Sequence, residues 1–266
     1  MKDALKGVRV IEMAFYYPGP FAGLVLSDLG AEVVKVESPD GDPMRPVGAR
    51  ANETMGPGFR VLNRGKKSVV IDLKTEAGKQ DFLALVRTAD VLLQVLRPDA
   101  MGRLGLGRDR LAAENPRLVH CLLTGYGATG PWANRAGHDI DYAAMSGVLG
   151  LTGAPGGDLA MPGVQIGDLC GALCALVDIL AAIRERDATG KGRFLDVSIT
   201  EAALLSNTFN LSGSWLPGDE ARPGGFLLSG RLPGYNIYRA RDGKWFALGA
   251  IEPKFWVGFC RAAGRE

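Results

Sequence analysis

Short apolar runs alternate with amphipathic stretches along most of the chain. Residues 8–13 and 90–96 are mainly apolar runs of strand length, and residues 75–89 between them repeat apolar side chains at helical spacing. The same criteria predict strands at 31–37, 68–73, 117–124 and 194–199, and helices at 18–29, at 108–114 and from Glu201. Short, mainly apolar strands separated by helices are typical of a parallel sheet covered on both faces. The pattern therefore predicts an α/β fold.

The clearest helix is predicted at residues 168–186. Its apolar stripe at helical spacing consists of Leu169, Ala172, Leu173, Leu176, Val177, Leu180 and Ile183. Gly190 and Gly192 end the pattern. No apolar run, this one included, is judged long enough to span a bilayer, so we expect no membrane segment.

The pattern changes near residue 217. Residues 212–234 are rich in Gly and Pro, which is typical of a linker. Strand-like runs at 235–240 and 244–251 then flank Arg241-Asp242-Gly243, a good signal for a hairpin turn. A hairpin after a series of parallel units favours a second, smaller domain.

We therefore predict a large α/β domain over residues 1–216 and the start of a smaller α+β domain over 217–266. The second domain would hold the hairpin and one short helix at 253–263, which are too few elements to close a core. The chain is expected either to be a fragment or to complete itself against a partner.

Composition narrows the class of protein. The 266 residues carry a formal net charge of +2, which argues against nucleic-acid binding and against a polybasic membrane anchor. Cys170 and Cys174 are close, but without a neighbouring histidine their spacing indicates core packing and no metal site. Met1-Lys2-Asp3 leads directly into the first strand, so we expect no signal peptide and a cytoplasmic location.

The first strand–helix turn imitates a dinucleotide-binding motif. Gly19 and Gly23 follow the first strand, and Glu37 ends the second. The spacing differs from G-x-G-x-x-G, and Pro20 removes a backbone N–H that a phosphate would need. We therefore expect these glycines to allow close packing of the helix on the sheet.

Three polar positions interrupt apolar surroundings. They are His138, Asp168 at the start of the long helix, and Glu252 at the end of a strand-like run. An imidazole and carboxylates beside apolar surface suit proton transfer at carbon. Each residue also has a structural interpretation: Asp168 as a helix N-cap, Glu252 before Pro253 as a helix start, and His138 as a loop residue.

Motifs of one known family are spread over nearly the whole chain. They are LKGVRVIE at 5–12, LSDLGAEVVKVE at 26–37, NRGKKS at 63–68, DLK at 72–74, RP at 97–98, RLGLG at 103–107, TGYG at 124–127 and GP at 130–131. In combination they resemble the family III CoA-transferases (CaiB/BaiF family), which include the α-methylacyl-CoA racemases. The resemblance implies a Rossmann-like large domain, a small domain and an interlocked homodimer, with active sites between the large domain of one subunit and the small domain of the other.

Three further motifs are similar to the racemase branch of the family: GHDIDY at 137–142, GD at 167–168 and GAIEP at 249–253. Transferases share the aspartate but generally lack the histidine and this glutamate motif. The resemblance implies that His138 and Asp168 act as bases on opposite faces of the α-carbon of a CoA thioester, with Glu252 polarising His138. The N–H groups at the start of the long helix would stabilise the enolate oxygen.

The resemblance also implies contacts with coenzyme A, which enters as part of the substrate; no metal or redox cofactor is needed. Candidate cations for its phosphates are Lys35, Arg64, Lys66, Lys67, Lys74, Arg97 and Arg103. Arg97 and Arg103 are favoured because they follow a strand end, and Tyr126 and Gly127 are further candidates. Candidates for lining the acyl channel are Phe15, Tyr16, Tyr17 and Trp215.

The leading hypothesis is a racemase or epimerase of 2-methylacyl-CoA thioesters. The first alternative is a CoA-transferase, in which Asp168 forms an acyl anhydride and then an aspartyl-CoA thioester. The second is a truncated, non-catalytic binder of CoA thioesters.

Overall fold

The structure is a computed structural model that describes residues 3–50, 53–213 and 221–265. The chain forms two compact units. The first unit contains Met1–Tyr142 and Ile166–Ala203, and the second contains Ala143–Gln165 and Leu204–Glu266. The boundary predicted between residues 216 and 217 falls outside the described residues, so the division into domains 1–216 and 217–266 stays a prediction.

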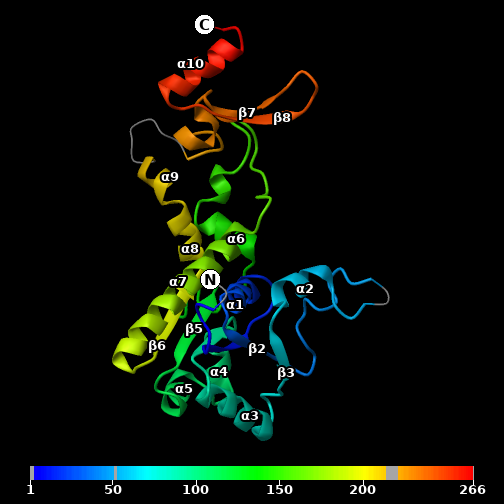
Figure 1. Ribbon diagram of the computed structural model, residues 1–266, viewed down its shortest axis with the longest axis vertical. Helices are drawn as coiled ribbons and strands as arrows, with labels where there is room; N and C mark the ends of the chain where they lie inside the picture. Colours follow the sequence, from blue (N-terminus) through cyan, green and yellow to red (C-terminus); the bar gives the residue numbers. More distant parts are fainter. Residues whose placement is uncertain (1–2, 51–52, 214–220, 266) are drawn as a thin grey trace. The chain divides into compact units, whose positions relative to one another are not determined.

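A six-stranded parallel sheet forms the centre of the first unit, in the order β3-β2-β1-β4-β5-β6 (Figure 1). The strands are β1 (Arg9–Met13), β2 (Glu32–Glu37), β3 (Lys67–Val70), β4 (Val91–Gln94), β5 (Val119–Thr124) and β6 (Arg193–Ser198). In register, Ile11 pairs with Val34 on one side and with Leu92 on the other. The predicted α/β fold is confirmed, and the strand order is that of Rossmann-like sheets.

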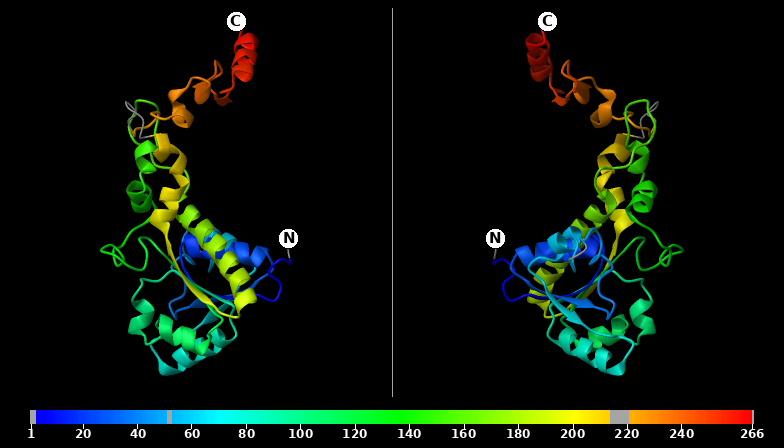
Figure 2. Two further views of the ribbon diagram at one scale, coloured as in Figure 1. Left: turned by 90° about the vertical axis from the view of Figure 1, so that its left-hand side faces the viewer. Right: turned by 90° about the vertical axis from the view of Figure 1, so that its right-hand side faces the viewer.

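Helices cover both faces of this sheet (Figure 2). One face carries α1 (Pro18–Asp28) and α7 (Ile166–Thr189), and the other carries α3 (Glu76–Arg87), α4 (Ala100–Arg103) and α5 (Arg108–Glu114). Successive residues along a strand supply the two cores in turn: Val91 and Leu93 face α1 and α7, whereas Leu92 faces the other layer. The other helices that begin in the first unit are α2 (Pro57–Asn63), α6 (Asp139–Met145) and α8 (Ile199–Ser206).

Helix α1 lies very close to the sheet. A Cβ atom at Gly19 would overlap the side chains of Ala14 and Val95, and one at Gly23 would overlap the Glu12 carboxylate. The predicted packing role of these two glycines is confirmed.

Helix α7 is longer than the predicted 168–186, and it is long and apolar enough to cross a membrane by length and composition. The expectation that no run is long enough is therefore wrong, because Ala, Cys and Ile residues extend the apolar surface of the helix beyond its stripe. In the fold the helix covers the sheet: Ala172, Ala175 and Ile179 are fully buried. A core helix of this kind passes the same test of length and composition.

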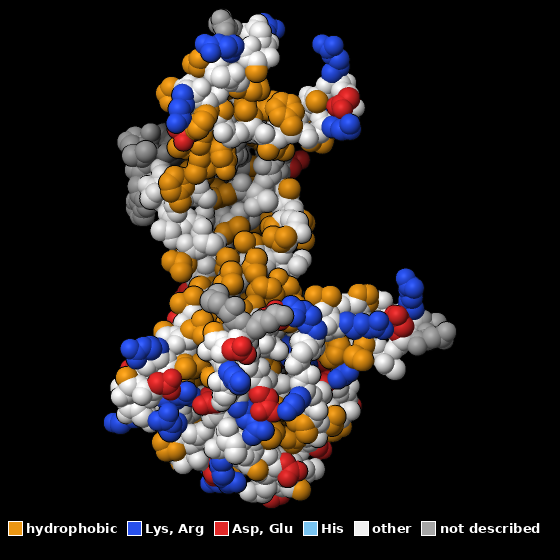
Figure 3. Space-filling view, viewed as in Figure 1, with side chains coloured by type: hydrophobic (Ala, Val, Ile, Leu, Met, Phe, Trp, Pro, Cys, Tyr) orange, Lys and Arg blue, Asp and Glu red, His pale blue; other side chains and the backbone are white. Residues whose placement is uncertain are grey.

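The second unit contains shorter elements. They are η1 (Leu149–Leu151), α9 (Thr208–Gly213), the irregular turn η2 (Leu227–Arg231), the antiparallel hairpin β7 (Tyr235–Arg239) and β8 (Trp245–Gly249), and α10 (Pro253–Ala262). The predicted hairpin is confirmed, and Gly243 in its turn has a φ of 83°, a conformation that favours glycine. Apolar side chains gather over β7 and β8 (Figure 3), where Ile237 and Trp245 are more than half exposed.

Candidate active site

The strand order changes direction between β1 and β4, at the centre of the sheet. In open parallel sheets, ligands bind at the carboxyl ends of the strands at this point. Two cavities lie there, a first cavity of about 410 Å³ and a second cavity of about 670 Å³. Phe15 and Leu96, which follow β1 and β4, line both, so the two cavities adjoin.

The first cavity brings His138 and Asp168 together. His138 directly precedes α6, and its backbone N–H donates a hydrogen bond to Asp141 Oδ2 at 2.8 Å. Its exposed ring meets the ring of Tyr16 edge-on, with centroids 6.4 Å apart. Asp168 lies in the first turn of α7. Two of the three predicted catalytic residues therefore share one cavity.

The start of α7 differs from the prediction. The helix begins at Ile166, two residues before Asp168, so the interpretation of Asp168 as an N-cap is wrong. The backbone N–H of Asp168 donates to Asp139 Oδ1 at 3.0 Å. This N–H group is therefore already occupied, and a substrate oxygen would have to use other donors.

The Asp168 carboxyl group has an unusual protonation equilibrium. Burial, together with the nearby negative charge of Asp139, raises its pKa from 3.8 to about 7. Burial and the Asp168 charge also raise the pKa values of Tyr17 and Tyr142, so both phenols remain neutral at neutral pH. A carboxyl group that titrates near pH 7 can both accept and release a proton under physiological conditions.

Tyr16 forms a strained corner of the first cavity. Its φ is 63°, and it is the one non-glycine residue with a positive φ in the part of the chain that the structure describes. Such conformations are costly and concentrate at functional sites. Phe15 and Tyr16 line the cavity, whereas Tyr17 stacks on Phe21 and Trp215 lies outside the described residues. The acyl channel stays a prediction.

Three arginines line the first cavity. Arg97 is exposed, and Arg103 forms an ion pair with Asp99 one turn away. The sequence analysis missed Arg135, whose guanidinium lies 4.2 Å from the centre of the Trp132 ring. The sequence could have indicated Arg135 as a site residue, because it lies only three residues before His138.

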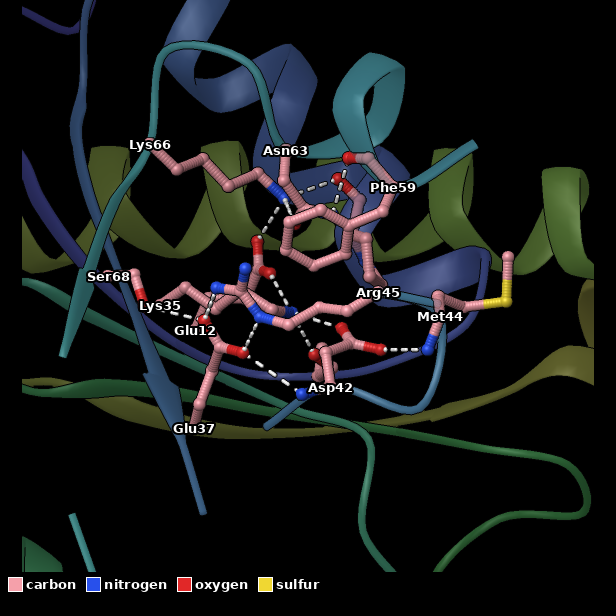
Figure 4. A network of polar contacts seen from close by, with 12 residues as sticks. Glu12, Lys35, Glu37, Asp42, Met44, Arg45, Phe59, Asn63, Lys66 and Ser68 are labelled. Carbon is pink, nitrogen blue, oxygen red and sulfur yellow. Dashed lines mark hydrogen bonds and ion pairs between the residues drawn. The ribbon is translucent and has the colours of Figure 1, made fainter. Parts of the chain in front are cut away.

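A buried network of charges adjoins the second cavity (Figure 4). Lys35 and Lys74 both line this cavity. Lys35 Nζ contacts Glu12 Oε1 at 3.2 Å, Asp42 Oδ2 at 2.8 Å and the carbonyl oxygen of Ala14. An ammonium group has three donors, so a phosphate would have to displace one of these acceptors. The predicted CoA contact of Lys35 stays a prediction, as does that of the exposed Lys74.

The same network fixes the loop that follows β2. Arg45 donates to both carboxylate oxygens of Glu37, at 2.6 and 2.7 Å, and Ser68 donates at 2.5 Å. Burial opposes ionisation of Glu37, but these hydrogen bonds outweigh it and lower its pKa to about 2. The loop residues 38–43 line the second cavity, so the network holds one wall of that cavity in place.

The other predicted cations have carboxylate partners. Arg64 forms two 2.6 Å hydrogen bonds to Asp28, Lys67 pairs with Glu32 at 2.6 Å, and Lys66 is buried 2.7 Å from Glu12 Oε2.

Two further CoA candidates do not line these cavities, and one catalytic candidate belongs to the second unit. Tyr126 packs its ring between Trp132 and Tyr142, and neither it nor Gly127 is among the described residues that line the two cavities. Glu252 belongs to the second unit, where it precedes α10. Its predicted contact with His138 stays a prediction.

Known proteins resemble the whole chain. Human alpha-methylacyl-CoA racemase is 38% identical over 98% of this chain, and succinyl-CoA–D-citramalate CoA-transferase of Chloroflexus aurantiacus is 36% identical over the same share. The chain spans 65% of the length of each of these relatives.

Solved structures agree with the sequence comparison. A CAIB/BAIF family protein from Brucella suis superposes with a TM-score of 0.85 at 30% identity, over 100% of this chain and 71% of its own. A hypothetical protein from Mycobacterium tuberculosis superposes with a TM-score of 0.81 at 34% identity, over 99% of this chain and 69% of its own. The sequence profile of CoA-transferase family III matches residues 5–266. The chain belongs to CoA-transferase family III.

Proposed function

We propose that this protein is a racemase or epimerase that inverts the α-carbon of 2-methylacyl-CoA thioesters. The observation that carries the proposal is the pairing of an exposed imidazole, His138, with a carboxyl group, Asp168, whose pKa is about 7, in one cavity. Inversion needs one group that accepts a proton and another that donates one, and both must change roles when the reaction runs backwards.

The reaction balances with these two groups alone. One base removes the proton from C2, and the electron pair of the broken C–H bond moves onto the thioester oxygen to form an enolate. The protonated partner then delivers its own proton to the opposite face of C2, and the electron pair returns to carbon. The enzyme ends with the proton on the first base, and proton exchange with water restores the starting state.

The two adjoining cavities suit a long thioester. We assign the reacting carbon to the first cavity because His138 and Asp168 line it. Coenzyme A carries phosphates, which favour cations, and we assign their binding to Arg97, Arg103 and Arg135 at the first cavity and Lys74 at the second. The pyrophosphate would then lie where the two cavities adjoin, and the adenosine end of coenzyme A would occupy the second cavity.

A CoA-transferase is the second candidate. Relatives named as CoA-transferases match this chain about as closely as the racemases do. In such a reaction the Asp168 carboxylate would attack the thioester carbonyl and release the CoA thiolate, giving an acyl anhydride. A nucleophile of this kind must be ionised, and His138 would have no obligatory part.

Hydrogen exchange separates the two candidates. The protein is incubated with a 2-methylacyl-CoA in heavy water, and deuterium at C2 is followed by mass spectrometry. Exchange with loss of chirality, abolished in both His138→Ala and Asp168→Ala, is the expected result. Transfer of CoA to an added carboxylic acid without exchange would establish the transferase. Neither activity in a folded protein would leave binding of CoA thioesters as the function.

We also propose a homodimer. The face of α7 that points away from the sheet carries Leu173, Val177 and Leu180, all of which are exposed. An apolar stripe on a helix normally packs against another surface.

A further inference from the structure

We propose that Asp139 is a positioning residue that acts through Asp168: it fixes the first turn of α7 and sets the protonation state in which Asp168 meets the substrate. This inference rests on the proposed proton transfer. It gives a role to Asp139, which the sequence analysis included only as part of the motif around His138.

The contact between Asp139 and α7 is direct. Asp139 Oδ1 accepts the backbone N–H of Asp168 at 3.0 Å. A Cβ atom at Gly167 would lie 3.2 Å from the same oxygen and 3.3 Å from Tyr142 Cβ. A side chain there would push the carboxylate away, so a glycine before Asp168 permits the close approach. The Asp139 carboxylate thus binds one of the N–H groups that the first turn of a helix leaves without a partner.

The same contact places two carboxyl groups side by side. When Asp139 is ionised, its charge disfavours ionisation of Asp168 and adds to the effect of burial. Asp139 Oδ1 accepts the Asp168 N–H at the positive end of the α7 dipole. Asp168 is therefore the member of the pair whose pKa is raised.

The other polar groups that line the first cavity are neutral or positively charged, or belong to His138. Tyr17 and Tyr142 are neutral near pH 7, since the ordinary pKa of a phenol is about 10 and both pKa values are raised further. The remaining titratable and charged side chains that line the first cavity are Tyr16, His138, Arg97, Arg103 and Arg135. The arginines carry positive charges that oppose the effect of Asp139, so the negative charge that keeps Asp168 protonated comes from Asp139.

Carbon-13 NMR of the protein labelled at its aspartate carboxyl carbons tests the inference without requiring turnover. Asp168→Asn identifies the Asp168 resonance. In the wild-type protein Asp168 is expected to titrate near pH 7, and the Asp139 resonance is expected to shift at the same pH. In Asp139→Asn, which keeps the hydrogen-bond acceptor and removes the charge, the midpoint for Asp168 should fall by on the order of one pH unit.

The matched control is Asp141→Asn. Asp141 lies on the same turn of α6 and binds the His138 N–H, and its removal should leave the Asp168 midpoint unchanged. In the exchange assay, Asp139→Asn should move the pH limb that belongs to Asp168 to lower pH while keeping the maximal rate. Asp139→Ala, which also removes the acceptor, should lower that rate by roughly 10- to 100-fold.

An Asp168 midpoint in the ordinary carboxyl range, or one that is unchanged in Asp139→Asn, overturns the inference. If Asp139→Asn does not fold, as judged by circular dichroism, the wild-type spectra decide: an Asp139 resonance that ignores the titration of Asp168 contradicts the coupling. Failure of the protein to exchange C2 protons would instead count against the proposed function alone.

Discussion

The carboxyl group of Asp168 opposes folding whenever it is ionised, because it is partly buried and lies near Asp139. In the unfolded chain it would titrate near 3.8, whereas in the folded protein its pKa is about 7. Because the folded pKa is the higher one, the stabilisation from this group is complete below pH 3.8. It is lost as the pH rises to 7. The raised pKa thus lowers the free energy of unfolding at neutral pH, and it is the same property that suits Asp168 to the proposed proton transfer.

Asp168→Asn should separate these two properties. The amide has nearly the same shape but never ionises, so the variant is expected to be more stable than the wild type at pH 8, by on the order of 2 kcal/mol. Below pH 4 the difference should vanish, and exchange activity should be absent at every pH. Urea unfolding at pH 4, 6 and 8 measures the effect, and a gain that is equal at all three pH values would contradict the expected loss of stability on ionisation.

At the scale of elements, the loop after β2 depends on one arginine. The Arg45 side chain binds the Glu37 carboxylate through two hydrogen bonds and lies 4.4 Å from the centre of the Phe59 ring, and its carbonyl oxygen accepts the Gly56 N–H at 2.7 Å. It thus joins β2, α2 and the loop whose residues 38–43 line the second cavity.

Arg45→Ala should loosen that wall and weaken binding of the nucleotide end of the substrate. We expect KM for the CoA thioester to rise about 10-fold, which corresponds to about 1.4 kcal/mol, with kcat little changed. The N-acetylcysteamine thioester of the same acyl group lacks the nucleotide, so its kcat/KM should not change. Steady-state kinetics with both substrates decides the matter.

The control for this variant lies in α2, the helix that Arg45 contacts through Phe59. Arg60 is exposed and pairs with Glu53 at 3.3 Å, and Arg60→Ala should leave both substrates unaffected. An equal loss with the full and the truncated thioester in Arg45→Ala would show that the loop does not serve the nucleotide.

The elements were largely predictable, because apolar runs between glycine and proline signals indicated every strand of the parallel sheet to within a few residues. Helix α2 was missed since its Pro57-Gly58 start is typical of a loop, and α4 since four residues hold no period. The motifs predicted His138 and Asp168 as partners. The Asp139 contact joins positions 29 apart, and only folding reveals a contact of that kind.

At the scale of the whole molecule, the exposed face of α7 bears on assembly. Val177, at its centre, is 65% exposed while its neighbour Leu176 is buried in the core. A carboxylate at this position would be buried without a partner in a dimer that used this face, and the cost of that burial is several kcal/mol.

Val177→Asp should therefore dissociate the proposed dimer while each subunit keeps its fold. We expect its dissociation constant to rise on the order of 100-fold, corresponding to about 3 kcal/mol, in sedimentation velocity over a range of concentrations. Asp178→Lys reverses the charge of an exposed residue on another side of the same helix, and it should remain dimeric. Unchanged association of Val177→Asp would exclude this face as the interface.

The chain leaves the first unit after Tyr142 and returns at Ile166. The hydrogen bond between Asp139 and Asp168 therefore joins the two ends of a long loop, residues 143–165. The entropy of closing such a loop grows only with the logarithm of its length: doubling it costs about 0.6 kcal/mol. Insertions and deletions within 143–165 should therefore cost little stability as long as the hydrogen bond between Asp139 and Asp168 is kept. We therefore expect relatives of this chain to differ more in length and sequence within 143–165 than at Asp139 and Asp168.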